Sequence, residues 1–300
     1  MAKKENKKRN QHYVPQYYQE GWANENGQVF CLRNGKIFQS APRNNAAIRD
    51  YYRMVPLSPD EKIFIYHFVD NWPPGIKKGA LELIETFFAA TDILDSAEKQ
   101  DKDENLSSMA DVKKNNLIED MFSQIEGEAN PLLERLRNGD ALFWDDEDEF
   151  GNFLYNLCMQ YSRTKQMENR ARVAMPIRYQ NSYSILRHLL GLMLFAKINA
   201  EWKEWSLTLL HNTTSIKFIT GGQPTVNLCP QINDDHAEMI LYYPVSPDYA
   251  CILRHERGKP HIYVKVDISE KEIIEYNNKI FDESGGHIIA TDDNELKHYI

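Results

Sequence analysis

The chain of 300 residues is 42% hydrophobic and 26% charged, and its formal net charge is −9. This length allows one large domain or two small ones with a sizeable core. No apolar run approaches the roughly 18 residues that a membrane span requires. The acidic balance argues against non-specific nucleic-acid binding, because that binding depends on neutralising phosphates.

The start of the chain lacks the apolar stretch of a secretory signal. The four cysteines lie far apart in the sequence and show no metal-binding spacing. We therefore expect a cytoplasmic protein with reduced thiols, and without a metal, a cofactor or a membrane partner.

The first nine residues carry five basic side chains and one acidic side chain. Residues 1–10 are therefore predicted to form a disordered basic arm. The arm is interpreted as a solubilising tail, with contact to a phosphate backbone as the alternative. Residues 11–300 are predicted to form a single α+β domain.

A dense polar and aromatic stretch follows, from Gln11 to Trp22. Pro15 fixes its own φ and favours an extended conformation before it, so residues 12–14 are predicted to be extended. A short helix is predicted from Gln16 to about Trp22. Two interpretations stay open: a functional site at a strand-to-helix junction, or an anchor that docks the N-terminus on the core.

A β-hairpin is predicted over residues 28–40. Asn34-Gly35 lies there between two β-rich runs, and such a pair is the strongest short hairpin signal. Residues 50–55 are predicted to form a further strand.

From about residue 61 to residue 200, apolar residues recur at spacings of three and four, which predicts a helical middle segment. One long amphipathic helix is predicted over residues 117–136. Pro131 lies inside it and is expected to kink or split it.

The last third returns to β structure. Residues 262–266 are expected to add an edge strand, and Ser269 with Glu272 forms a capping box for a helix to about Phe281. The N-terminal hairpin and the C-terminal antiparallel strands are expected to share one sheet, which gives an α+β fold. The four main strands are predicted over residues 204–211, 216–220, 237–243 and 249–254.

Most familiar catalytic motifs are absent, including the P-loop, the dinucleotide-binding glycine motif and the HExxH metal site. Three segments remain as candidates: His12–Gln16, Gln160–Thr164 and Thr220–Pro224. Each combines hydrogen-bonding side chains with an apolar element that would hold them in place.

The order of these motifs carries a resemblance. The chain shows His12-Tyr-Val-Pro-Gln16, then Gln160-Tyr-Ser-Arg-Thr164, then Phe218-Ile-Thr with Pro224, then Tyr243-Pro-Val-Ser-Pro-Asp248. In this it resembles the DUF4238 family of uncharacterised bacterial proteins. The resemblance implies a bacterial cytoplasmic protein with no established activity. The third motif of the family usually carries an acid where this chain has Gly222, which argues against a metal centre or a catalytic acid there.

The first functional hypothesis is an enzyme that acts on a phosphodiester or a nucleotide, such as a nuclease. A setting in phage defence or a toxin system comes from the loci that such families occupy, and not from these residues. His12 would be the general acid or base and Arg163 an anion clamp. The residues that would bind the substrate are Tyr13, Gln16, Gln160, Thr220 and Gln223.

Two alternatives stand beside it. The same residues could belong to a non-catalytic module that binds a ligand or a protein partner, or they could form a purely architectural hydrogen-bond network. In each case Gln160 and Arg163 are predicted to face the His12-Tyr13 segment, with residues 221–223 closing one side. A half-buried arginine needs an acceptor, so Arg163 is expected to meet a distant acid such as Asp50, a backbone carbonyl or a ligand phosphate.

Overall fold

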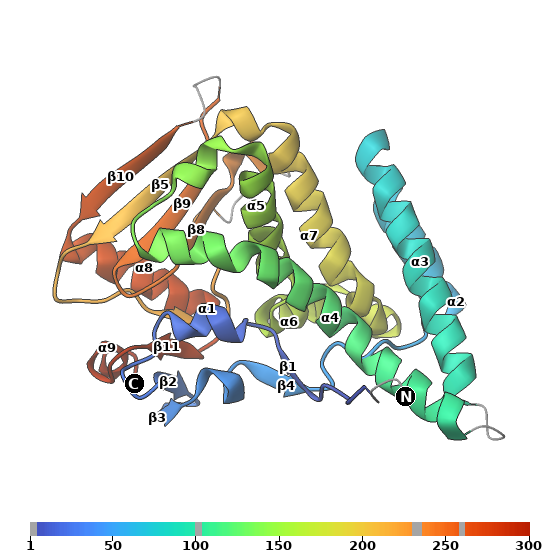
Figure 1. The fold of residues 1–300 in the computed structure, drawn as a ribbon. Coiled ribbons are helices and arrows are strands. Elements are labelled where there is room, and N and C mark those ends of the chain that lie inside the picture. Colours follow the sequence, from blue (N-terminus) through green and yellow to red (C-terminus); the bar gives the residue numbers. More distant parts are fainter. Residues whose placement is uncertain (1–4, 100–103, 230–235, 258–261) are drawn as a thin grey trace.

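The computed structural model describes residues 5–99, 104–229, 236–257 and 262–300. Its elements form an α+β fold in which long helices from the middle of the chain lie beside a sheet from the last third (Figure 1). Strands from both ends of the chain meet below them. No helix in these ranges is long and apolar enough to cross a bilayer.

The predicted helical middle segment is confirmed: between residues 61 and 200 the described part of the chain contains no strand. Short 3-10 turns occupy residues 142–145 and 177–182. The helices are α2 (Pro59–Val69), α3 (Pro74–Glu98), α4 (Glu104–Arg137), α5 (Glu147–Ser162), α6 (Lys165–Ala174) and α7 (Tyr183–Ala200).

Helix α4 begins well before the predicted residue 117, and Pro131 does not split it. Leu132, Leu133 and Leu136, which follow the proline, are all buried. Their packing offsets the single backbone hydrogen bond that a proline removes, so the helix continues to its end.

The predicted hairpin is confirmed as β2 (Val29–Arg33) and β3 (Lys36–Ser40), paired antiparallel. Asn34 and Gly35 between them have φ values of 53° and 70°. A two-residue turn with this backbone matches the twist of the flanking strands, and asparagine and glycine tolerate it best.

The opening stretch forms a short strand and a short helix. β1 (Asn10–His12) pairs antiparallel with β4 (Ala47–Arg49), and α1 (Gln16–Glu20) follows Pro15. The helix ends two residues before the predicted Trp22.

The strand predicted over residues 50–55 is wrong. Asp50 has a positive φ of 55°, which turns the chain at this point. The amide of Tyr52 donates to the Gln11 side chain, and the amide of Met54 donates to a carbonyl of α4. These partners replace a neighbouring strand, while the burial of Tyr52 and Met54 explains why the sequence looked β-like.

A five-stranded sheet contains the long C-terminal strands in the order β10-β5-β9-β8-β7. Its pairs are antiparallel except that β10 lies parallel to β5 at one edge, where an edge strand was predicted. β8 starts later than predicted, because residues 236–238 form a 3-10 turn. The strands are β5 (Trp205–Asn212), β7 (Val226–Asn227), β8 (Ile240–Pro244), β9 (Tyr249–His255) and β10 (Tyr263–Ile268).

A second sheet, in the order β3-β2-β11-β6, joins the two ends of the chain through β6 (Thr220–Gly221) and β11 (Ile288–Ala290). The expected shared sheet therefore holds for the hairpin and these two short strands, whereas the long C-terminal strands form a sheet of their own. The strand predicted over residues 216–220 is reduced to its last residue. The amides of Phe218 and Ile219 donate instead to a carbonyl of the β8–β9 turn and to the side chain of Asn277.

Two helices complete the fold. The predicted capping box of Ser269 and Glu272 is confirmed at the start of α8 (Glu270–Glu283), and α9 (Asn294–Lys297) is a single turn near the end of the chain. Both lie at the same end of the molecule as β2, β3 and β11 (Figure 1).

The described part of the basic arm differs from the expected disordered tail. Lys7 and Lys8 pair with Asp111 and Asp120 of α4 at 2.7 Å and 2.6 Å. The amide of Lys8 donates to the Asn116 side chain. These ion pairs and hydrogen bonds hold residues 5–8 along the helix, whereas Arg9 and Asn10 pair with residues 49–50. Residues 1–4 of the predicted arm lie outside the described residues.

Candidate functional site

The junction between α5 and α6 presents three of the polar side chains singled out in the sequence. Arg163 ends α5, and Thr164 caps α6 by accepting a hydrogen bond from the amide of Met167. Gln160 lies one turn before the end of α5 and is buried. A threonine at the first position of a helix accounts for this break, although the periodicity of the sequence did not reveal it.

Gln160 and Arg163 face the Tyr13 segment, as predicted. The Gln160 amide donates to the Tyr13 carbonyl at 2.9 Å, and its oxygen accepts two hydrogen bonds from Arg163. The guanidinium of Arg163 also lies over the ring of Phe122, 4.3 Å from its centroid.

The partner of Arg163 is a distant acid. Its Nη2 lies 2.5 Å from a carboxylate oxygen of Glu126 on α4, and its side chain is only 2% exposed. Asp50, the acid proposed from the sequence, pairs instead with Arg9 at 3.3 Å. Glu126 and Gln160 occupy the Nε and Nη2 donors of Arg163, so an incoming phosphate would compete with them for this side of the guanidinium.

The turn at residues 221–223 closes the other side of this cluster. The Thr164 hydroxyl donates to the side-chain oxygen of Gln223, and the Gln223 amide donates to the carbonyls of Tyr161 and Thr225. Gln223 is therefore fully used as a bridge between the strand segment and α5.

Gly222 lies beside His287. A Cβ atom at Gly222 would lie 3.5 Å from Nδ1 of that histidine, within ordinary contact distance. The same Cβ atom would lie 3.5 Å from the carbonyl oxygen of Ser284, so a side chain at this position would contact both residues.

A chain of buried side chains continues from Tyr13. Its hydroxyl shares a 3.1 Å hydrogen bond with Nδ1 of His287, and Nε2 of His287 lies 3.0 Å from Asn45, which donates to Gln19 at 2.9 Å. Burial lowers the pKa of His287 to about 4 and raises the pKa of Tyr13 to about 12. The histidine is thus neutral at pH 7. The sequence offered no signal for His287, Asn45 or Gln19. All three lie outside the three candidate motifs.

The aromatic residues of the opening stretch anchor it to the sheets. The Tyr18 hydroxyl donates to the Pro244 carbonyl at 2.6 Å and shares a 2.7 Å hydrogen bond with Thr220. The Trp22 indole donates to the Phe218 carbonyl. All these side chains are buried, so Thr220 serves this contact and not an open site.

The two remaining candidates lie nearer the surface. His12 is partly buried, its Nε2 lies 3.1 Å from the Arg43 carbonyl, and burial lowers its pKa. Gln16 is exposed and donates to Glu20. Neither shares a hydrogen bond with Gln160, Arg163 or Gln223 in the described structure.

An unusual carboxyl group lies near Arg163. Burial raises the pKa of Glu119 on α4 to about 7, and the charge of Glu126 also raises it, against the opposing charge of Arg163. The described residues contain no group of three or more His, Cys, Asp or Glu side chains placed to hold a metal ion. Glu119 is thus a group that can bind a proton near pH 7, but the hydrogen bonds and the ion pair among Gln160, Arg163 and Glu126 favour the architectural interpretation of these motif residues.

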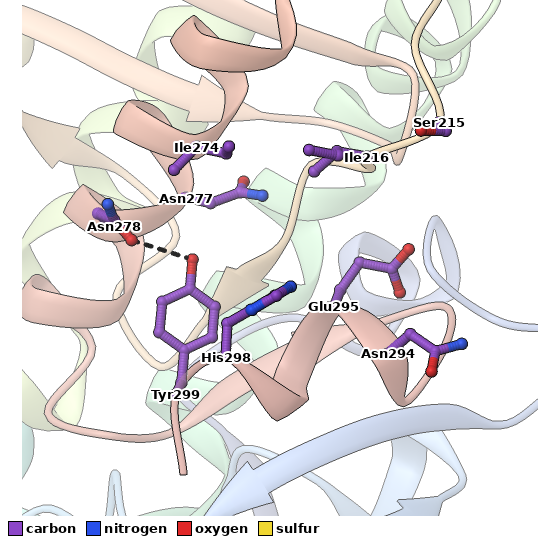
Figure 2. A pocket seen from close by; sticks show the side chains of 9 residues that line it. All are labelled: Ser215, Ile216, Ile274, Asn277, Asn278, Asn294, Glu295, His298 and Tyr299. Atoms are coloured by element: carbon purple, nitrogen blue, oxygen red, sulfur yellow. Dashed lines mark hydrogen bonds between the residues drawn. The ribbon is translucent and has the colours of Figure 1, made fainter.

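An open cavity lies elsewhere, between α8, α9 and the loop after β5. Its volume is about 420 Å³ and its lining is mostly apolar. Figure 2 shows the Glu295 side chain rising from α9 toward the loop that carries Ile216. Sequence patterns did not point to this cavity, because its three walls come together only in the folded chain. It is lined by Ser215, Ile216, Ile274, Asn277, Asn278, Asn294, Glu295, His298 and Tyr299.

Comparison with known proteins gives a family but no relative of established function. No curated protein and no solved structure matches the chain. The model of one family, described as a protein of unknown function (DUF4238), matches residues 10–294. That range covers all the motifs described above, and the chain therefore belongs to the DUF4238 family.

Proposed function

We propose that this protein is a non-catalytic binding module, and that the cavity between α8 and α9 takes a small organic ligand. The observation that carries the proposal is the contrast between two places in the molecule. Gln160, Arg163 and Gln223 are buried and hydrogen-bonded to neighbouring protein groups, whereas the cavity is open to a ligand. A volume of about 420 Å³ falls within the range of small-molecule sites, which are mostly apolar with a few convergent polar groups.

The proposal is for a protein that acts in the bacterial cytoplasm. Among the described residues, the four cysteines are free, and three of them are buried. Free, buried thiols suit a reducing compartment.

A cavity-blocking variant tests the proposal. Ile274 lines the cavity and is 45% exposed, so Ile274→Trp would fill the space without replacing a core residue. The matched control is Ile93→Trp, at an isoleucine on α3 that is 67% exposed and does not line the cavity. A fragment set is screened by thermal shift, and fragments that raise the melting temperature of the wild type are expected to do so for Ile93→Trp but not for Ile274→Trp. The proposal is wrong if no fragment stabilises the wild type, or if fragments stabilise both variants equally.

The phosphodiester hypothesis has weaker support. It needs an anion at Arg163, where Glu126 already lies 2.5 Å from the guanidinium. Its remaining support is that His12 is partly buried and lies within electrostatic reach of Glu126 and Arg163. Incubation with RNA, DNA and nucleotides tests it: cleavage by the wild type that is lost in His12→Ala would make an enzyme the better proposal.

A further inference from the structure

Among the described residues, Glu295 is the one acid that lines the cavity between α8 and α9. Its Oε2 atom is enclosed and has no hydrogen-bond partner among those residues. Burial disfavours the charged carboxylate, and backbone hydrogen bonds at Asp292 and Glu295 offset this cost only in part, so the pKa of Glu295 is raised. Because Glu295 lines the cavity, a cationic donor on a ligand there would lie beside this incompletely paired carboxyl group.

Several other polar groups around the cavity are already engaged. Asn277 accepts from the Ile219 amide and donates to the Lys217 carbonyl, and the Asn278 oxygen accepts from the Tyr299 hydroxyl (Figure 2). Their hydrogen bonds fix the shape of the walls. They leave Glu295 as the group that selects the charge of a ligand.

The charged groups near Glu295 do not neutralise it. The positive charge of Lys217 acts on Glu295, but the Lys217 ammonium lies 2.7 Å from Asp248. Asp292 adds negative charge, and Lys297 on α9 is paired with Asp293 at 2.9 Å. The local field is therefore negative, in keeping with the net charge of −9.

From this geometry we infer that the ligand is an organic cation: a primary ammonium group on an apolar body, with the ammonium bound by the Glu295 carboxylate and the body against Ile216 and Ile274. The inference rests on the proposed function of the cavity. Charge complementarity and the apolar walls select this class, because an anion would meet an unpaired carboxylate and a purely apolar molecule would leave it unsatisfied.

Three probes with the same aromatic body and different head groups test the inference by calorimetry on the full chain. They are phenethylamine, a cation; phenethyl alcohol, which is neutral; and hydrocinnamate, an anion. We expect phenethylamine to bind about tenfold more tightly than the alcohol, and hydrocinnamate to bind more weakly than either, because a charge-assisted hydrogen bond adds to the apolar contact.

Glu295→Gln removes the charge and keeps the shape. The preference for phenethylamine over the alcohol should fall by about tenfold in this variant, while the alcohol should bind as in the wild type. The matched control is Glu275→Gln, which removes an equal charge from α8 at an exposed residue outside the cavity. It should leave the preference unchanged.

The pH dependence gives a second measurement. Burial raises the pKa of Glu295, so its carboxylate takes up a proton at a higher pH than an exposed glutamate. The affinity for phenethylamine should therefore fall as the pH is lowered through the pKa of Glu295, while the alkylammonium keeps its charge. His298 also lines the cavity, and Asp292 and Lys217 act on Glu295. His298→Gln is therefore tested in parallel and should keep the same pH profile.

The outcomes separate the two proposals. If the three probes bind equally and Ile274→Trp abolishes their binding, the cavity binds ligands but the inference of a cation is wrong. If neither these probes nor any fragment binds, the proposed function itself is wrong. If Glu275→Gln weakens phenethylamine as much as Glu295→Gln does, the preference comes from the general negative field, and the assignment to Glu295 is overturned.

Discussion

Arg163 is the residue whose role the structure defines most sharply. Its guanidinium is buried between Glu126, Gln160 and the Phe122 ring. Arg163→Met should lower the free energy of unfolding by about 3 kcal/mol, because the substitution leaves a partly buried carboxylate and a buried amide without their partner. Urea unfolding monitored by fluorescence measures this loss.

A matched surface pair provides the control for Arg163. Arg170 forms a 2.6 Å ion pair with Glu283 and is 44% exposed at its side chain. Arg170→Met should cost less than about 1 kcal/mol, as exposed pairs do. Equal stability changes for the two variants would contradict a structural role for Arg163 and restore it as a candidate for binding.

His188 predicts a dependence of stability on pH. It is buried on α7, stacks on Phe122 and has no partner for either ring nitrogen among the described residues. Burial lowers its pKa from 6.5 to about 3. As the pH falls from about 6.5 toward 3, the unfolded chain gains a proton that the folded chain does not, so folded stability is lost over this window.

His188→Phe keeps the aromatic stack and removes the titration. Melting temperatures at pH 7.5 and pH 5 should therefore differ less for this variant than for the wild type. An unchanged difference would show that another group causes the acid sensitivity, and His287 is a candidate because burial lowers its pKa to about 4.

At the scale of elements, the α5–α6 junction depends on one hydroxyl. Thr164 caps α6 through the Met167 amide and also donates to Gln223. Thr164→Val keeps the shape of the side chain but loses both hydrogen bonds, and should cost about 2 kcal/mol. Thr164→Ser keeps the hydroxyl and should recover most of this loss in thermal or urea unfolding. If valine and serine are equally stable, the hydroxyl does not hold the junction.

The elements that the sequence predicts well are those decided by local physics. The Asn34-Gly35 turn, the Ser269 capping box and the spacing of apolar residues in the middle segment each act within a few residues. Residues 50–55 and 216–220 were predicted less well, because their amides bond to a side chain, a helix or a turn that lies far away in the sequence.

The contacts of the candidate site were likewise predicted only in part from the sequence. The sequence predicted that Gln160 and Arg163 face the Tyr13 segment; Gln160 bonds to the Tyr13 carbonyl, and Arg163 is linked to it through Gln160. It did not predict Glu126 as the ion partner, since nothing in a helical pattern identifies which exposed acid turns toward another helix. The cavity at Glu295 was missed for the same reason, because its walls come from three separate segments.

At the scale of the whole molecule, the N-terminal segment packs against the helical middle of the chain. Residues 5–8 lie along α4, and Asn115 and Asn116 are buried beneath them. The Asn115 amide donates to the Lys8 carbonyl, and the Asn116 amide donates to the Asn6 carbonyl at 2.9 Å. The backbone of this segment thus satisfies polar groups that water would otherwise have to reach.

This arrangement predicts that the backbone of the segment matters more than its charges. Lys7→Gln with Lys8→Gln should lower the free energy of unfolding by less than about 1 kcal/mol per pair, because these ion pairs are partly exposed. Deleting residues 1–9 should cost more, on the order of 3 kcal/mol, because two buried amides lose their acceptors. Urea unfolding at low and high salt separates the contribution of the ion pairs from that of the backbone hydrogen bonds. Added salt weakens the ion pairs and leaves the cost of the deletion almost unchanged. If the double lysine variant and the deletion lose equal stability, and salt removes both losses, the segment is held by charge alone.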